Sequence, residues 1–277
     1  MSSLSNSTSD LHLSQPELWQ FYLALMPRSI DFILYAPSQD DSLVVRSLAL
    51  DNSGGDYLKA VENVVYDNPV LLNDFHSVRV LIDAPHFVIV PPTVSDNDDL
   101  DALLRIAYPD AQGEGMLCRL PHCGMGIVSE VPQGVLPFVQ RTFNNPPVVH
   151  HLYPLCEHFE RLNAHSSIAR MFVNLSPHRM DLVVYRQWRL ELANTFNYRS
   201  MDDAAYFILH AYDSLKMNRL SDEIQLSGDR DVREQLTPLL RRFINYVMPA
   251  IYPAAALRLG HDAMKAPFDL IMLALCE

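Results

Sequence analysis

Glycine is scarce in this sequence, with nine residues in 277 against nineteen prolines. Loops that wrap a phosphate group need glycine, because its missing side chain lets backbone N–H groups approach the phosphate oxygens. Pairs of closely spaced glycines occur at Gly54-Gly55, Gly113-x-Gly115 and Gly124-x-Gly126. The scarcity therefore argues against several glycine-rich nucleotide-binding motifs.

Positive charge is also in short supply, with 21 Lys and Arg against 33 Asp and Glu and a net charge of −12. Nucleic acids and anionic membrane surfaces both require clustered positive charge, so neither is an expected partner. No apolar run approaches the roughly 20 residues of a membrane-spanning helix. Residues 1–10 lack the basic start and apolar core of a signal peptide. We expect a cytoplasmic protein without membrane insertion, whose residues 1–10 form a disordered tail.

Cysteine is limited to Cys118, Cys123, Cys156 and Cys276, and no pair has Cys-x-x-Cys spacing. Without a secretory signal, reduced thiols are expected. Hydrophobic residues make up 49% of the chain and charged residues 19%, so the chain can bury a core without disulfides.

The order of the predicted elements repeats along the chain. Short apolar runs rich in strand formers, separated by Pro, Ser, Asp or Asn, predict strands, and apolar residues three and four apart predict helices. The first half gives three strands, a helix and a fourth strand, at 19–25, 30–36, 43–50, 58–65 and 78–82. The second half gives the same order at 170–175, 180–186, 190–196, 201–215 and 223–226, with Ser200 as the expected helix cap.

The two halves also match at a constant offset of 150 residues. Identical residues stand at Leu25 and Leu175, Pro27 and Pro177, Asp31 and Asp181, and Tyr35 and Tyr185. The alternative is that any strand–turn–strand hairpin selects proline and apolar residues. We predict a duplication, with a first unit at 11–165 that carries an insertion around 86–120 and a second unit at 166–277.

The remaining segments connect and extend the two copies. Between them, helices are predicted at 100–107, 135–143 and 152–163, and strands at 116–120, 125–129 and 147–151. After the second copy we expect a helix at 232–246 that Pro238 starts or kinks, a strand at 247–252, a loop at 254–267 and a buried element at 268–276.

Three antiparallel strands followed by alternating helices and strands resemble the ribonuclease H-like unit, and two such units in tandem resemble the actin-like ATPase fold of actin, Hsp70 and the sugar kinases. Residues 171–277 are similar to an uncharacterised bacterial family, a domain of unknown function with an actin-like fold. This similarity lies in Phe-Val-Asn-Leu at 172–175, Asp-Leu-Val-Val-Tyr at 181–185, Leu-Ala-Asn-Thr-Phe at 192–196 and Leu-Ser-Gly-Asp at 226–229. The resemblance implies an α/β protein of two units, each a mixed sheet of about five strands flanked by helices.

The resemblance also implies where a nucleotide would lie. Actin-like ATPases hold ATP and magnesium between the units, on hairpin turns with Asp-x-Gly patterns and on a Gly-Gly pair in the second unit. Here both turns carry proline without glycine, and Gly228 stands alone. Asp31 and Asp181 are expected at the hairpin or rim rather than as magnesium ligands. The candidate cleft residues are Pro27, Arg28, Ser29, Ser176, Pro177, His178, Arg179, Ser227, Gly228 and Asp229.

Several polar clusters have two interpretations each. Zinc ligands are suggested by Cys118, His122, Cys123, His150, His151, Cys156 and His158, but the spacing is not a recognised one and buried free thiols explain it better. Cys123 beside His122 or His150 lacks the signature of a nucleophile. The acidic run at 96–101 is expected to cap a helix rather than bind calcium. Arg230, Arg233, Arg241 and Arg242 are expected on a solvated helix face.

These features favour a non-catalytic actin-like binding or scaffold module, with no catalytic residues, no metal and no cofactor. Its cleft or outer sheet edge would bind an unknown protein partner or a small ligand. The alternative is a divergent ATP-binding protein or phosphotransferase. In that case Arg28, Ser29, Ser176, His178 and Arg179 would face the nucleotide as donors and positive charge. The sequence leaves the oligomeric state open.

Overall fold

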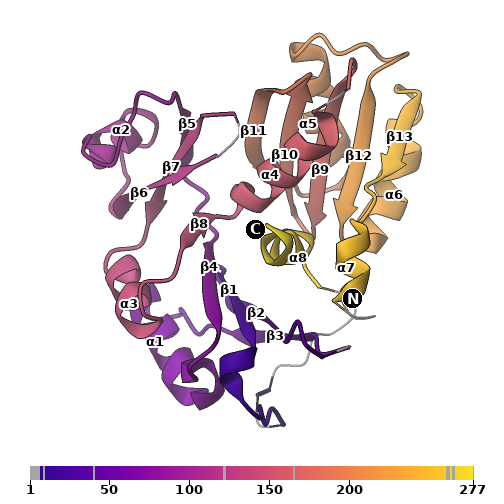
Figure 1. The fold of residues 1–277 in the computed structure, drawn as a ribbon. Coiled ribbons are helices and arrows are strands. Elements are labelled where there is room, and N and C mark those ends of the chain that lie inside the picture. The colour runs from indigo at the N-terminus through magenta and orange to yellow at the C-terminus, as the bar shows by residue number, and fades with distance from the viewer. Residues whose placement is uncertain are drawn as a thin grey trace.

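The structure is a computed structural model that describes residues 7–8, 10–39, 41–120, 123–164, 166–259, 263 and 266–276. Strands in this part of the chain form two five-stranded mixed sheets and a smaller three-stranded sheet (Figure 1). The predicted α/β fold class is confirmed.

The first sheet has the strand order β3-β2-β1-β4-β8. Strands β1 to β3 are antiparallel, whereas β4 and β8 run parallel to β1. The strands are β1 Gln20–Leu25, β2 Ser29–Tyr35, β3 Val44–Ala49, β4 Ser77–Ile82 and β8 Val148–His150. The 3-10 helices η1 Pro16–Leu18 and η2 Pro69–Leu72 flank this region.

The second sheet repeats this plan with the order β11-β10-β9-β12-β13. Its strands are β9 Ala169–Ser176, β10 Arg179–Arg186, β11 Arg189–Asn197, β12 Glu223–Gly228 and β13 Tyr246–Pro249. Pairing also has the same register: Leu25 lies opposite Ile30 in the first sheet, as Leu175 lies opposite Met180 in the second. A duplication would give both sheets the same strand order and register, as observed here, and it remains a prediction.

Successive side chains along each strand point to opposite faces of its sheet. This arrangement gives each sheet a core on its outer face, and the two inner faces share a central core. Ile30, Phe32 and Leu34 of β2 pack with α1 Tyr57–Asp67 and α3 Val135–Thr142 on the outer face of the first sheet. The corresponding even-numbered residues of β10 pack with α5 Met201–Ser214 and α6 Arg230–Leu240. Ser200 caps α5 as predicted, in a capping box with Asp203.

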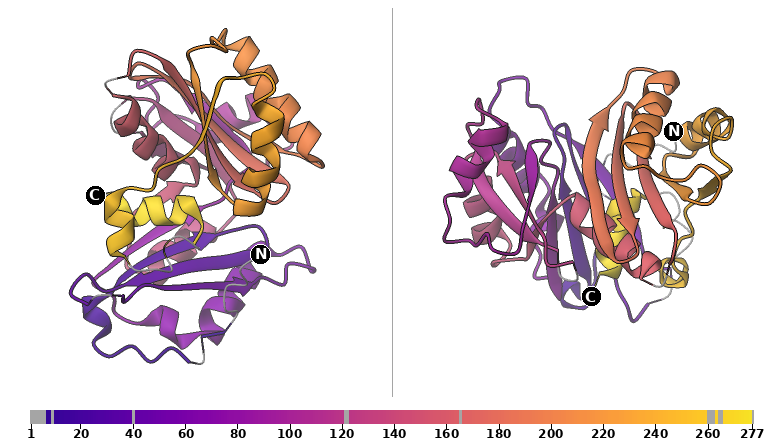
Figure 2. Two further views of the ribbon diagram at one scale, coloured as in Figure 1. Left: turned by 90° about the vertical axis from the view of Figure 1, so that its right-hand side faces the viewer. Right: turned by 90° about the horizontal axis from the view of Figure 1, so that it is seen from above.

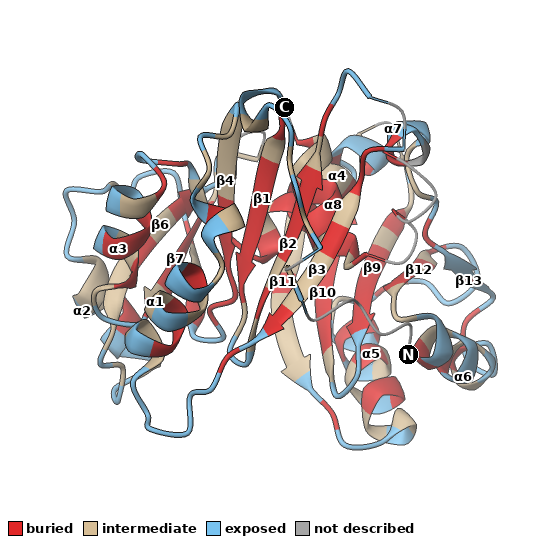
Figure 3. Ribbon diagram, turned by 90° about the horizontal axis from the view of Figure 1, so that it is seen from below, coloured by how far each residue is buried: buried red, intermediate tan, exposed pale blue. Residues whose placement is uncertain are grey.

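The central core joins the two sheets. Helices α4 Leu152–Asn163 and α8 Phe268–Leu275 supply most of its helical side chains, and α8 lies between the sheets (Figures 1 and 2). The ring of Phe159 stacks on that of Phe172 from β9 at a centroid distance of 4.1 Å, and on that of Phe268 at 5.9 Å. Because α8 is apolar on nearly all sides, it is stable only when surrounded by protein. Buried residues accordingly predominate in α8 and in the inner strands β1, β9 and β10 (Figure 3).

The three-stranded sheet has the order β5-β7-β6 and spans Phe87 to Val131 together with α2 Leu100–Ala107. Its strands are β5 Phe87–Val90, β6 Glu114–Arg119 and β7 Gly126–Val131. Strand β5 is not among the elements expected from the sequence, because four apolar residues are too few to show a period. Asp99 accepts a hydrogen bond from the Ala102 N–H at 2.9 Å, so the acidic run caps a helix as predicted.

The chain after residue 230 departs from its predicted elements. Helix α6 ends at Leu240 rather than at 246, and Pro238 lies in its last turn, where it neither starts nor divides the helix. A proline there removes only one late hydrogen bond. Residues 254–267 were expected to be a loop, but Ala254–Arg258 form α7, since three consecutive alanines favour helix.

The tail expected at 1–10 lies partly outside the described residues, which omit 1–6 and 9. Asp10 forms an ion pair with Arg46 of β3 at 3.1 Å. In the described ranges, no helix combines the length and apolar character needed to cross a membrane.

Candidate functional site at the junction of the two sheets

The turn between β1 and β2 carries the first three candidate residues. Pro27 and Arg28 are exposed at its tip, and Ser29 begins β2. The Met26 N–H donates to the Ser29 carbonyl oxygen at 2.9 Å, and the Tyr57 hydroxyl of α1 donates to the Met26 carbonyl oxygen at 3.0 Å. The turn is closed by its own backbone and anchored to α1.

The equivalent turn between β9 and β10 holds the next four candidates. Ser176, Pro177 and His178 are exposed, and His178 has a φ of 67°, which glycine adopts more readily than histidine. Arg179 differs from its neighbours because its side chain is only 20% exposed and contacts acidic residues. Of the residues on this turn, Arg179 alone is drawn into the junction.

Ser227, Gly228 and Asp229 lie beside that turn, because β12 pairs with β9. The buried Ser227 hydroxyl donates to the Asn174 side-chain oxygen at 3.2 Å. A Cβ atom on Gly228 would stand 2.0 Å from the Leu175 carbonyl oxygen, so close strand packing requires glycine here. Asp229 caps α6 by accepting from the Val232 N–H at 3.0 Å. Each of these residues thus has a structural role.

Arg179 links the two sheets through ion pairs. Its guanidinium group pairs with Asp83, which follows β4 of the first sheet, and lies 3.3 Å from Asp181 Oδ1 on β10. The Asp83 side chain is 1% exposed and that of Asp181 is 7% exposed. Asp181 therefore lies in the β9–β10 hairpin, as one of its two expected places had it, but it is buried in the junction and not on an exposed rim. The odd-numbered positions of β10 face the central core.

His151, which precedes α4, lies between the two carboxylates. Its Nδ1 is 3.3 Å from Asp83 Oδ1, and its Nε2 is 3.5 Å from Asp181 Oδ1 and 3.1 Å from the Thr195 hydroxyl oxygen. Thr195 in turn donates to Asp181 Oδ1 at 2.8 Å. Asp83, His151, Arg179 and Asp181 are called the junction network below.

Contacts within the junction network favour the charged forms of Asp181 and Arg179. Burial raises the pKa of Asp181, but the hydrogen bond and charge of His151 and the charge of Arg179 outweigh burial and hold the pKa below its usual range. Burial lowers the pKa of Arg179, and Asp181 and Asp83 more than reverse this, so the guanidinium stays charged. At the start of α8, burial and the nearby charge of Asp181 raise the pKa of Asp269 to about 6.

Sequence reasoning missed Asp83 and considered His151 only as a zinc ligand. A signal for Asp83 existed: it follows β4 where Asp229 follows β12. The N–H of Asp83 donates to the carbonyl oxygen of Leu25 at 3.0 Å, and that of Asp229 to the carbonyl oxygen of the equivalent Leu175 at 2.7 Å. His151 gave no signal, because its position depends on the path of the chain between β8 and α4.

The Cys/His-rich stretch does not assemble a metal centre in the described ranges, where no three His, Cys, Asp or Glu side chains converge on one point. His122 lies outside the described residues. Burial raises the pKa of the Cys118 thiol to about 12 and also raises that of Cys123. A nucleophilic thiol needs a lowered pKa, so Cys123 lacks the required environment.

The two five-stranded sheets have the arrangement of the actin-like ATPase fold, and comparison with known proteins agrees on this fold. Residues 8–247 match the family described as "Protein of unknown function (DUF3822)", so the chain belongs to that family. The predicted membership of an uncharacterised family with an actin-like fold is thereby confirmed. A comparison with curated proteins finds no match.

Two solved structures show the same fold. One is a Bacteroides thetaiotaomicron protein with an actin-like ATPase fold and unknown function, which is 19% identical, covers 96% of this chain and 99% of its own, and superposes with a TM-score of 0.78. The other belongs to a PilM–PilN type IV pilus biogenesis complex, with 10% identity, coverage of 95% and 100%, and a TM-score of 0.55.

Proposed function

We propose that this protein is a non-catalytic actin-like module that binds a protein partner, and that the junction network holds its two sheets together where an actin-like ATPase would hold a nucleotide. The observation that carries the proposal is the position of Arg179. Its guanidinium group, on the turn expected to receive phosphates, is already engaged by Asp83 and Asp181. A phosphate would have to displace two buried carboxylates from it.

Charge around the junction also disfavours a nucleotide. Asp83, Asp181 and Asp269 place three acidic groups near Arg179 and His151. Like charges repel more strongly in a buried site than in water, so the acidic groups oppose a polyphosphate. The same carboxylates are poor magnesium ligands while they remain paired with Arg179, because the cation would have to replace the guanidinium.

The proposal of a protein partner has independent support from one structural neighbour. The PilM–PilN complex has a component with this fold, and its name says that the component assembles with another protein. An actin-like fold can thus serve assembly. By the same proposal, the partner binds the surface of this protein, and its binding does not depend on nucleotide hydrolysis.

Thermal unfolding tests the proposal directly. Ligand at 100 times its dissociation constant stabilises a protein by about 2.7 kcal/mol, so millimolar Mg-ATP, Mg-ADP and Mg-GTP would raise the melting temperature if they bound with micromolar affinity. We expect no shift with any of them, measured against matched concentrations of magnesium and triphosphate. A rise that Arg28→Ala or Arg179→Ala abolishes would support the divergent ATP-binding protein instead.

A further inference from the structure

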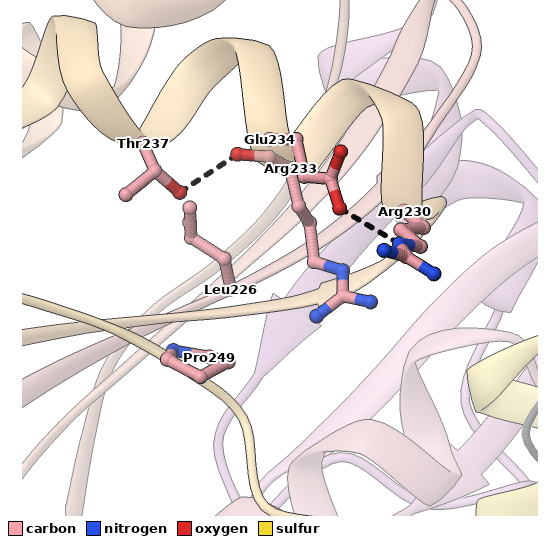
Figure 4. Close-up of a pocket in the computed structure, with 6 residues that line it drawn as sticks. All are labelled: Leu226, Arg230, Arg233, Glu234, Thr237 and Pro249. Atoms are coloured by element: carbon pink, nitrogen blue, oxygen red, sulfur yellow. Dashed lines mark hydrogen bonds and ion pairs between the residues drawn. The ribbon is translucent and has the colours of Figure 1, made fainter.

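A pocket of about 270 Å³ lies away from the junction network, between α6 and the carboxyl ends of β12 and β13 (Figure 4). Ligands of α/β proteins commonly bind at the carboxyl ends of parallel strands. Leu226 and Pro249, which pair across the two strands, form its apolar wall. The rest of the lining comes from one face of α6, at the helical spacing of Arg230, Arg233, Glu234 and Thr237.

Arg233 is the unusual member of this lining. Its Nε atom is buried without a hydrogen-bond partner, and its guanidinium group forms no ion pair with any residue in the described ranges. Figure 4 shows the group extending from α6 towards the strands. A buried N–H donor without an acceptor is costly, so an acceptor that a ligand brings to Nε would relieve that cost.

The other polar groups of the pocket are already engaged. Glu234 accepts from Arg230 Nε at 2.7 Å, on the exposed side of the helix. The Thr237 hydroxyl donates to the Arg233 carbonyl oxygen at 2.7 Å. The free hydrogen-bonding capacity therefore consists of N–H donors on Arg233, with further donors on Arg230, beside an apolar wall.

We propose that this pocket binds a small oxyanion, a carboxylate or phosphate group carried on a compact apolar body, and that Arg233 is its main partner. The planar guanidinium group matches both oxyanions with two parallel hydrogen bonds. Leu226 and Pro249 would contact the apolar body. The volume is below the ~300–1,000 Å³ of sites for drug-sized ligands, which limits the ligand to a few heavy atoms beyond its charged group. This inference is independent of the junction network and of the proposed function.

Isothermal titration calorimetry on the full chain tests the pocket with four probes: benzoate, phenyl phosphate, inorganic phosphate and the neutral isostere benzamide. We expect benzoate or phenyl phosphate to bind with at least tenfold higher affinity than benzamide. Arg233→Met keeps the aliphatic packing of the side chain while removing its charge, and should weaken oxyanion binding at least tenfold. Arg242→Met is the matched control, because Arg242 is exposed and lies over the Phe243 ring at 5.9 Å.

The arms of the experiment separate the ligand chemistries. Binding of benzoate would assign the pocket to carboxylates, and binding of phenyl phosphate without benzoate would assign it to phosphate groups. Binding of inorganic phosphate alone would overturn the proposed apolar body of the ligand. Affinity that persists in Arg233→Met, or absence of binding for all four probes, would overturn the proposal. If Arg233→Met fails to fold by circular dichroism, Arg233→Lys, which keeps the charge but loses the paired hydrogen bonds, should bind more weakly than the native chain.

Discussion

Asp31 and Asp181 occupy the same position in the two sheets, yet they behave in opposite ways. Each stands on the second strand of its sheet and accepts a hydrogen bond from a hydroxyl on the third strand, from Ser47 at 2.5 Å and from Thr195 at 2.8 Å. Burial raises the pKa of Asp31 despite its hydrogen bonds, whereas the pKa of Asp181 lies below its usual range.

The difference comes from the residues around each carboxylate. Ser29 stands in the first sheet where Arg179 stands in the second, so Asp31 has a serine beside it where Asp181 has a guanidinium group. His151 is also near Asp181. The same strand arrangement thus holds a carboxyl group with neutral hydroxyl partners in one sheet and a carboxylate paired with charged side chains in the other.

Among the variants that test this comparison, removal of the Arg179 guanidinium group should lower the free energy of unfolding most. Arg179→Met leaves Asp83 and Asp181 buried without their shared cation, so the free energy of unfolding should fall by about 3–5 kcal/mol. Urea denaturation measures it. Arg186→Met is the matched control on the same strand: its ion pair with Glu191 at 2.9 Å is more exposed and should contribute about 0–1 kcal/mol. Equal losses in the two variants would contradict a special role for the junction.

Neutralising each aspartate separately should reveal the opposite pKa shifts. Asp181→Asn should lower the free energy of unfolding at pH 7 by about 1.5–3 kcal/mol, because it weakens charged hydrogen bonds. Asp31→Asn should leave it unchanged or raise it, because the folded state disfavours the ionised form of Asp31.

The pH dependence of the free energy of unfolding tests the direction of the two pKa shifts independently. Because its folded pKa is lowered, Asp181 contributes stability above the unfolded pKa of about 3.9, and this contribution is lost as the pH falls towards the folded pKa. Asp31 has a raised folded pKa, so its contribution is present at low pH and is lost as the pH rises through that value. Urea denaturation from pH 3 to 7 measures the free energy of unfolding of the native chain, Asp181→Asn and Asp31→Asn. The difference between the native chain and each variant should change with pH in opposite directions for the two aspartates, and changes of the same sign would refute the comparison.

The smallest effect is expected at the turn tips. His178 has a φ of 67°, whereas Arg28, at the equivalent position, is not among the residues with positive φ. His178→Gly should therefore raise the free energy of unfolding by up to about 1 kcal/mol, and Arg28→Gly should lower it by about 0.5–1 kcal/mol. Differential scanning calorimetry of both variants would detect the difference, and a change of the same sign in both would show that the turns are alike.

Strand and helix order followed from local patterns, because apolar alternation and helical spacing act over a few residues. The short β5 and helix α7 were missed, since four apolar residues show no period and a helix of five residues has a weak signal. Arg179 was found through its turn and its repeat position. Asp83 and His151 were not, because β4 and the start of α4 approach Arg179 only after both sheets have formed.

The sequence by itself determined the two repeated strand orders, the capped helices and the glycine-poor turns, because these depend on neighbours along the chain. The tertiary structure decided which charges meet at the junction and that Arg233 faces a pocket without an acceptor. The physical reason is that charge pairing depends on distance in space, and side chains separated by 96 residues, as Asp83 and Arg179 are, come together only through packing of the central core.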